Sequence, residues 1–376
     1  EVGGRVGSRA VCGLFLQDTA HTGISPLSLE AAVRTRLDMA SATDGLAGQL
    51  NPVAGVTHIT GGFDSISVIT AGTGSSILRG FNTTAAWTID SPLSTYADTV
   101  GGESVDFSGF ADLRGNSSVD TFRVADTSTV TTAITGGGGS DSLTGRDTGN
   151  TFAITGANSG TLTGGGTVTF SQIPSLIGGA GVDTFAFGLT GSLSGAGFAI
   201  NGAGGDDVIS GDSNGNAYTS SADNTGTLVG KATFQSVEVL LGGAAADDFD
   251  IDDDFRIVDG LGGNDTFNVA DGVRLNSLGG GSGNDTITIG DVNNVGFFVM
   301  QIDGGVGNDT INGAGANLGS VVLSIDGGDG NDMITGTGGN DTLIGSDGND
   351  PLLGRAGKDS LAGAYGAAPS NGHTTT

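Results

Sequence analysis

The sequence predicts an all-β fold, a right-handed parallel β-solenoid with coils of about 18–24 residues. Two observations carry this prediction. The chain has 73 glycines and only 6 prolines in 376 residues, a composition typical of many tight turns. One pattern, Gly-Gly-x-Gly-x-Asp-x-apolar, also recurs, most clearly at 280–287, 304–311 and 327–334. Because a fixed repeat makes each coil resemble the next, it favours a solenoid over a globular domain.

The spacing of the motif aspartates gives the length of a coil. Four aspartates follow one another at nine-residue intervals, so two motifs complete one coil: Asp332, Asp341, Asp350 and Asp359. Upstream, successive aspartates are separated by about one coil length: Asp247, Asp265, Asp285, Asp309 and Asp332. The steps from Asp141 to Asp183 and from Asp206 to Asp247 are about twice as long. We interpret each of these long steps as two coils of about 21 residues.

Residues 1–50 form an N-terminal segment without the repeat. Pro26 can begin a helix, and Leu29, Val33 and Leu37 share one face of it, which favours a helix over residues 26–40. Such a helix would cap the open end of the solenoid, where strand edges are otherwise unpaired. A linker from an upstream domain is the alternative, and both interpretations stay open.

Residues 51–255 are interpreted as a solenoid of degenerate long repeats. Phe107, Phe170 and Phe234 recur at nearly equal intervals of three coil lengths, and other apolar residues and aspartates repeat at the same interval. This second period predicts a larger unit of three coils, present about three times.

Residues 256–363 hold the regular repeats. Apolar, β-prone runs such as 297–302 and 321–325 separate the glycine turns, as expected of stacked strands. The small, polar segment 364–376 is expected to be disordered.

The repeated aspartates are candidate calcium ligands. Glycines allow tight turns, the aspartate supplies a hard oxygen ligand, and backbone carbonyls can supply the remaining oxygens that Ca²⁺ prefers. Stacked coils bring the aspartates about 5 Å apart, where a cation between them removes their repulsion. We predict that Asp332 stacks with Asp350, Asp341 with Asp359, and Asp309 with both Asp285 and Asp332. The predicted metal ligands are Asp141, Asp183, Asp206, Asp265, Asp285, Asp309, Asp332, Asp341, Asp350 and Asp359.

Charge and cysteine content exclude several classes of partner. The formal net charge of −28 disfavours nucleic acid and anionic membranes, whereas it favours divalent cations. Cys12 is the only cysteine, so an internal disulfide is impossible. The sequence contains no run of eighteen apolar residues, so it predicts no membrane-spanning helix. The chain begins at Glu1 without a signal-peptide pattern, and we expect it to be a fragment or a processed product.

The glycine-aspartate motifs resemble the RTX, or hemolysin-type, calcium-binding repeats of secreted bacterial proteins. The resemblance is most specific over 327–361 and weakens back to Gly136. It implies a β-roll with several Ca²⁺ ions, secretion by type I export, and a role as a structural or adhesive segment. The implied partners, besides calcium, are a cell surface, a matrix polymer or copies of the chain.

Enzyme motifs are weak, and we predict that the chain is not an enzyme. Residues 191–195 match the Gly-x-Ser-x-Gly pattern of hydrolases, but no strand-turn-helix context surrounds them. The histidines, His21, His58 and His373, form no zinc motif. A carbohydrate lyase or epimerase on a parallel β-helix is the alternative. An aromatic-lined groove with clustered aspartate and arginine would favour it.

Overall fold

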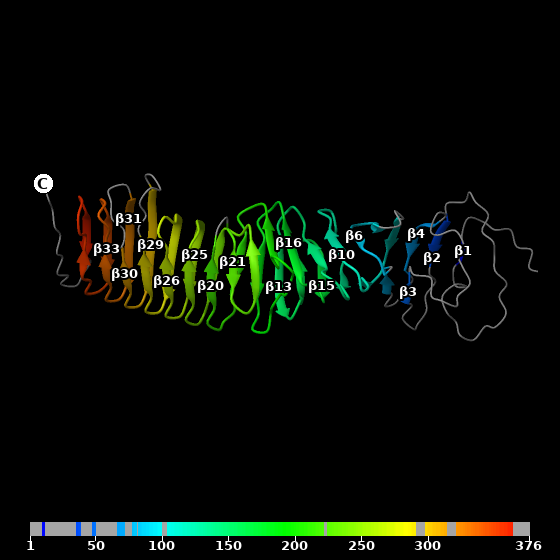
Figure 1. Ribbon diagram of the computed structural model, residues 1–376, viewed down its shortest axis with the longest axis horizontal. Coiled ribbons are helices and arrows are strands. Elements are labelled where there is room, and N and C mark those ends of the chain that lie inside the picture. Colours follow the sequence, from blue (N-terminus) through cyan, green and yellow to red (C-terminus); the bar gives the residue numbers. More distant parts are fainter. Residues whose placement is uncertain are drawn as a thin grey trace, which may run out of the picture. The chain divides into compact units, whose positions relative to one another are not determined.

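The computed structural model describes residues 10–11, 35–38, 47–49, 66–71, 77–80, 82–99, 104–221, 224–290, 298–313 and 321–363. Over these ranges the regular secondary structure consists of β-strands, most of them paired in parallel (Figure 1). The predicted all-β, parallel solenoid class is therefore confirmed, while its right-handed winding stays a prediction. The chain divides into two compact units. Unit 1 is Glu1–Asn150 with Asn158–Ile177, and unit 2 is Thr151–Ala157 with Gly178–Thr376. The predicted boundaries at residues 50, 255 and 363 remain predictions.

In unit 1 the strands belong to two sheets. The first sheet contains β1 (Ala10–Val11), β2 (Thr35–Asp38), β4 (Ile66–Thr70), β6 (Ala85–Ile89), β7 (Ser94–Asp98), β8 (Ser104–Ser108), β10 (Asp120–Val124), β12 (Ser142–Thr144) and β16 (Ser175–Gly179). The second contains β3 (Ala47–Gln49), β5 (Ile77–Arg79), β9 (Asp112–Arg114), β11 (Thr132–Thr135), β14 (Ser159–Thr163) and β15 (Thr167–Ser171).

Unit 2 has the same two-sheet arrangement. The first sheet contains β18 (Ile200–Ala203), β20 (Ala217–Ser220), β21 (Gly226–Leu228), β22 (Ala232–Gln235), β24 (Asp248–Ile251), β26 (Thr266–Val269), β28 (Thr286–Ile289), β30 (Thr310–Asn312), β32 (Met333–Thr335) and β34 (Leu352–Leu353). The second contains β13 (Thr151–Gly156), β17 (Thr184–Phe187), β19 (Val208–Ser210), β23 (Val239–Gly243), β25 (Phe255–Leu261), β27 (Leu275–Ser282), β29 (Phe298–Val306), β31 (Val321–Asp329), β33 (Thr342–Ser346) and β35 (Ser360–Gly363).

The strand register of unit 2 confirms the predicted length of a coil. From β24 onward the chain alternates between the two sheets, so one coil consists of two strands and two turns. Along the first sheet, Asp248 pairs with Thr266, Thr266 with Thr286, and Thr286 with Thr310. Beyond β30, Thr310 pairs with Met333, and Ile334 pairs with Leu352. Each strand is thus paired with the strand one predicted coil length later. The nine-residue repeats therefore contribute two motifs to each coil, as predicted.

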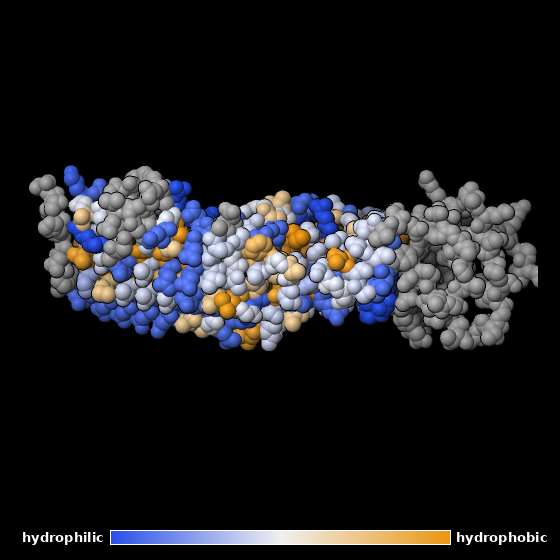
Figure 2. Space-filling model, viewed as in Figure 1, coloured by the Kyte–Doolittle hydropathy of each residue, from blue (hydrophilic) through white to orange (hydrophobic). Residues whose placement is uncertain are grey.

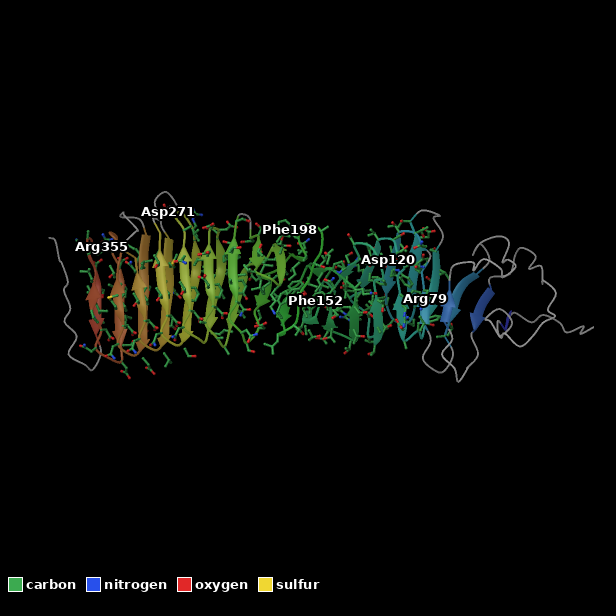
Figure 3. All side chains as sticks on the ribbon, turned by 60° about the horizontal axis from the view of Figure 1, so that its bottom comes forward. Arg79, Asp120, Phe152, Phe198, Asp271 and Arg355 are labelled. Atoms are coloured by element: carbon green, nitrogen blue, oxygen red, sulfur yellow. The ribbon has the colours of Figure 1, made fainter. Side chains whose placement is uncertain are left out.

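The core of unit 2 is a set of apolar ladders between the sheets. The rings of Tyr218, Phe249 and Phe267 stack with centroid distances of 4.7 and 4.8 Å, and Ile287 continues the same column. Buried and more exposed side chains alternate along many strands, as in β26 and β28. Figure 3 draws the side chains on the ribbon. Because each fully buried side chain of this size contributes about 1.5–3 kcal/mol, the ladders stabilise every coil on its neighbours.

Antiparallel insertions explain the longest repeats. Strands β20, β21 and β22 pair antiparallel, and the coil that contains them, from Asn216 to Asp247, is longer than any coil that follows it. Strands β6, β7 and β8 form a similar meander, and β14 pairs antiparallel with β15. The interpretation of the two long aspartate steps as two plain coils each is therefore wrong. Phe107, Phe170 and Phe234 occupy the closing strands of the insertions, which explains why they recur at the period of the larger unit.

The helix predicted over residues 26–40 is wrong for Thr35–Asp38. These residues form β2, in which Leu37 pairs with Ala10 of β1 and with Ile69 of β4. Parallel pairing on both sides outweighs the helical spacing of the apolar residues. The rest of that segment and the predicted disordered tail, 364–376, lie outside the described residues.

Candidate metal centre

Aspartates immediately before the strands of the first sheet form a continuous column in unit 2. The backbone N–H of each except the last donates to Oδ1 of the aspartate one coil later, at 2.7–3.0 Å. The column contains Asp247, Asp265, Asp285, Asp309, Asp332 and Asp350, all between 0% and 3% exposed. The predicted stacking of Asp285, Asp309, Asp332 and Asp350 is confirmed.

Other aspartates form shorter columns. At the second sheet of unit 2 the N–H of Asp341 donates to Asp359 Oδ1 at 2.9 Å, which confirms that predicted pair. In the same sheet Asp183 donates to Asp207 Oδ1 at 2.8 Å. In unit 1 Asp120 donates to Asp141 Oδ1 at 2.8 Å.

The position predicted for Asp206 belongs to its neighbour. Asp207 is fully buried and stacks with Asp183, whereas Asp206 is exposed and forms an ion pair with Arg256 at 3.2 Å. Both aspartates have an apolar residue two places later, so that rule could not separate them. The decisive signal is Gly202, five residues before Asp207, which occupies the same place in the other turns.

That glycine explains why the motif begins as it does. If Gly304 carried a Cβ atom, the atom would lie 2.7 Å from Oδ2 of Asp309 and 2.5 Å from the carbonyl oxygen of Gly327. The aspartate side chain therefore folds back over the first residue of its own turn, where only glycine fits. We number the turn from this glycine as position 1 to the aspartate as position 6.

With the exception of the turn that ends at Asp183, the turns fall into two kinds. In five turns, which we call closed, the N–H of position 2 donates to the side chain at position 6, at 2.6–3.2 Å. The closed turns end at Asp120, Asn150, Asn216, Asp247 and Asp341. In eight turns, which we call open, positions 2 and 4 both have positive φ. The open turns end at Asp141, Asp207, Asp265, Asp285, Asp309, Asp332, Asp350 and Asp359.

The open turns have buried carboxylate oxygens without a hydrogen-bond donor. Within the described part of the chain, seven of the eight have a buried Oδ2 that accepts no hydrogen bond: those of Asp141, Asp207, Asp265, Asp285, Asp309, Asp332 and Asp350. An unsatisfied buried carboxylate oxygen is costly, and either protonation or a bound cation removes that cost. Asp341, a predicted ligand, differs: its Oδ2 accepts hydrogen bonds from the N–H and the hydroxyl of Thr337 at 2.7 and 2.9 Å.

Some open turns adopt this conformation against the preference of their residue. Position 2 is Ala203, Leu261, Ser346 or Arg355 in four of them, with φ between +61° and +76°. A left-handed conformation costs a non-glycine residue about 1–2 kcal/mol. Such strain persists where the surrounding structure requires it, and it is often found at ligand sites.

The donor set fits calcium better than a transition metal. No group of three or more His, Cys, Asp or Glu side chains converges within the described ranges, so a metal here must also use backbone carbonyls. Backbone carbonyl oxygens of adjacent turns lie close to one another's backbone. At Gly307, for example, an added Cβ would overlap the carbonyl oxygen of Gly283 in the preceding coil. Carboxylate and carbonyl oxygens in flexible number suit Ca²⁺, while softer metals prefer nitrogen or sulfur.

A second column, of asparagines, was not predicted. The N–H of Asn284, Asn308, Asn331 and Asn349 each donates to the Oδ1 of the preceding asparagine at 2.7–3.0 Å. These residues lie at position 5 and are exposed. In this column the later residue donates to the earlier one, whereas in the aspartate column the earlier residue donates to the later one. The recurring Asn-Asp pair in the sequence is the pattern from which this asparagine column could have been predicted. On the face shown in Figure 2, hydrophilic residues form a band along one edge of the C-terminal coils.

Acid is expected to stabilise the metal-free coils. Burial raises the pKa of Asp141, Asp309 and Asp332 to about 6 and of Asp207 and Asp265 to about 7. Between about pH 4 and pH 7 the folded form then holds protons that the unfolded chain has lost, so the free energy of unfolding falls as pH rises. In a chelator, circular dichroism should report more β-structure near pH 5 than near pH 8. More β-structure near pH 8 would contradict this.

A scan against protein families matches the RTX calcium-binding nonapeptide repeat, in four copies, at residues 301–317 and 326–361. No curated protein matches the chain. Repeats of this family bind multiple calcium ions, and the matched region contains the stacked turns of Asp309, Asp332 and Asp350. The resemblance predicted from the sequence is thus confirmed where the model of this repeat family matches, at residues 301–317 and 326–361.

Proposed function

We propose that the chain is a calcium-dependent structural or adhesive segment of a secreted or cell-surface bacterial protein, and that its C-terminal coils fold when calcium binds. One observation carries the proposal. Five successive open turns, from Asp265 to Asp350, stack in one column and have buried oxygens without donors. A cation between adjacent turns would satisfy these oxygens and neutralise the column.

Calcium would be held by Oδ2 of the position 6 aspartate together with backbone carbonyls of the same and adjacent turns. It would supply charge neutralisation and a fixed geometry for the turn, with no chemical step. Affinity on the order of 0.1–1 mM per site, typical of extracellular modules, would tie filling to the calcium of the medium. Low calcium inside the cell would then leave the coils unfolded until export.

A scaffold agrees better with the placement of the aromatic residues than an enzyme does. Trp87, Tyr96 and Tyr218 are each 1% exposed, so their rings are committed to the core and cannot stack on sugars. A cavity in unit 1 beside Pro92 and Phe107 measures about 40 Å³, far too small for a sugar ring. We therefore propose a non-enzymatic role, with a cell surface, a matrix polymer or another copy as the partner. Over the described residues no helix is long and apolar enough to cross a membrane.

Isothermal titration calorimetry tests the proposal by counting ions. The chain should bind between about five and ten calcium ions. Asp332→Asn should lower the count by about one or two, because Asp332 lies between two neighbouring open turns. Asp329→Asn is the matched control, since Asp329 lies in the same turn but is exposed. One ion or none in the unaltered chain, or an equal loss in both variants, would refute the proposal.

A further inference from the structure

The closed turn 211–216 of unit 2 contains its own substitute for a metal ion. Its first residue, Gly211, packs against the position 6 side chain as in the open turns, but that side chain is Asn216. Oδ1 of Asn216 accepts from the N–H of Asp212 at 3.2 Å. Nδ2 donates to the carbonyl oxygens of Asp212 and Asn214 at 3.1 and 2.8 Å. The amide thus satisfies the backbone oxygens of positions 2 and 4.

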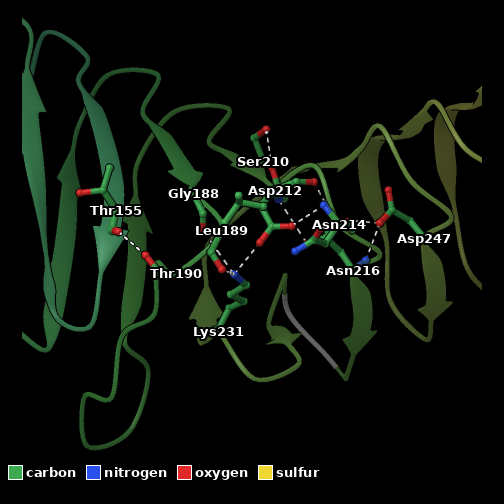
Figure 4. A network of polar contacts seen from close by, with 11 residues as sticks. Thr155, Gly188, Leu189, Thr190, Ser210, Asp212, Asn214, Asn216, Lys231 and Asp247 are labelled. Carbon is green, nitrogen blue, oxygen red and sulfur yellow. Dashed lines mark hydrogen bonds and ion pairs between the residues drawn. The ribbon is translucent and has the colours of Figure 1, made fainter.

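A lysine neutralises the remaining carboxylate of this turn. Nζ of Lys231 lies 2.6 Å from Oδ2 of Asp212 and donates to the carbonyl oxygens of Leu189 and Gly188 at 3.0 and 3.3 Å (Figure 4). The side chain of Asp212 is 3% exposed and that of Lys231 is 17% exposed. An ammonium group with three donors therefore sits among three oxygen atoms, the ligand type that a calcium ion would use.

The lysine reaches this place because of the antiparallel insertion. Lys231 lies between β21 and β22, and its carbonyl oxygen accepts from the N–H of Leu193 at 2.7 Å. The meander that lengthens this coil thus delivers the positive charge.

The next coil is also satisfied by protein atoms alone. Oδ1 of Asp247 accepts from the N–H of Asn216 at 2.5 Å, and its Oδ2 accepts from the N–H of Gly243 at 2.6 Å. Both carboxylate oxygens therefore have donors. The first orphaned Oδ2 in this column belongs to Asp265.

Unit 1 contains an independent example. In the closed turn 145–150, Nδ2 of Asn150 donates to the carbonyl oxygen of Arg146 at 2.7 Å, and its Oδ1 accepts from the N–H of Arg146 at 2.9 Å. Arg146 is 1% exposed, and its guanidinium donates to the carbonyl oxygen of Ser128 at 3.2 Å. Asparagine at position 6 and a basic side chain that donates to backbone carbonyl oxygens thus occur together in both units, but Nε and Nη1 of Arg146 have no hydrogen-bond partner.

We infer that the turns ending at Asn216 and Asp247 need no calcium, because Asn216 and Lys231 occupy the role of the ion. The segment from β20 to β24 then folds without metal and is the platform on which the calcium-dependent coils from Asp265 onward assemble. The inference rests on the proposed calcium sites of the open turns. It adds that, along the first-sheet column of unit 2, the boundary between metal-independent and metal-dependent turns lies at Asp247; the open turns that end at Asp141 and Asp207 lie outside this column.

Hydrogen-deuterium exchange of the full chain in a calcium chelator tests the division. Amides of 217–251 should exchange at least about 100-fold more slowly than those of 266–353. Equal, rapid exchange in both segments would overturn this inference and leave the calcium dependence of the open turns intact. Slow exchange in both would instead refute folding on calcium, so the two failures are distinguishable.

Variants of Lys231 test its role directly. Lys231→Met should speed exchange of 217–251 in chelator by about 100-fold, since it leaves the Asp212 carboxylate buried without its partner. Lys231→Arg keeps the charge and should retain most of the protection. Lys358→Met is the control, because Lys358 is exposed. In saturating calcium the number of bound ions should not change in any of the three. Unaltered protection in Lys231→Met would contradict the proposed role.

Discussion

In a calcium chelator near pH 7.5, the chain is expected to lose most of its far-ultraviolet β-signal from the coils between β26 and β35, and to regain it when calcium is added. Five open turns bring their aspartates together in one column. At a separation of about 5 Å and an effective dielectric of about 20, each adjacent pair repels by roughly 3 kcal/mol. Four such pairs give roughly 12 kcal/mol, as large as the whole stability of a typical domain.

Circular dichroism with a chelator, followed by calcium titration, measures this change. Magnesium is the control ion, because it gives up its waters reluctantly and should restore far less β-structure than calcium at the same concentration. A spectrum that does not change on chelation would show that the coils fold without metal. Recovery with magnesium alone would show that screening of charge, and not a calcium geometry, is what the column needs.

The regular part of the fold could be predicted because its local and long-range signals agree. The glycine turn, the aspartate and the apolar residue that follows repeat at the period of one coil, so the register of β26 to β34 follows from the sequence. The insertions could not be predicted in this way. Strands β20, β21 and β22 have ordinary β-prone sequences, and only their pairing reveals that they run antiparallel.

The sequence predicted where the turns of the candidate site lie, but not which of them are open and which are closed. The column positions of Asp309, Asp332 and Asp350 follow from spacing, since one residue per coil must share an edge. Whether a turn is open depends on φ at position 2, and there Leu261 and Arg355 adopt a conformation that sequence preference assigns to glycine. The closure of Asp341 by Thr337 likewise depends on the direction of one N–H.

The second large effect is expected at Gly307, position 4 of the turn that ends at Asp309. Gly307 has φ of +146°, and a Cβ there would overlap the carbonyl oxygen of Gly283 in the preceding coil. Gly307→Ala should therefore separate two adjacent turns and remove the oxygen arrangement of at least one calcium site. We expect a loss of about 3–5 kcal/mol in the free energy of unfolding, from backbone strain and the steric overlap together.

Gly272→Ala separates the two contributions. Gly272 also has positive φ, +85°, but a Cβ there would meet nothing within 4 Å. This variant should lose only the backbone strain of about 1–2 kcal/mol and should keep the full number of calcium ions. Thermal unfolding in saturating calcium, together with calorimetric ion counts, measures both variants. Equal destabilisation would mean that the glycines serve only to permit positive φ. A larger loss for Gly307→Ala, with fewer bound ions, would mean that close approach of the glycine turns is what builds each site.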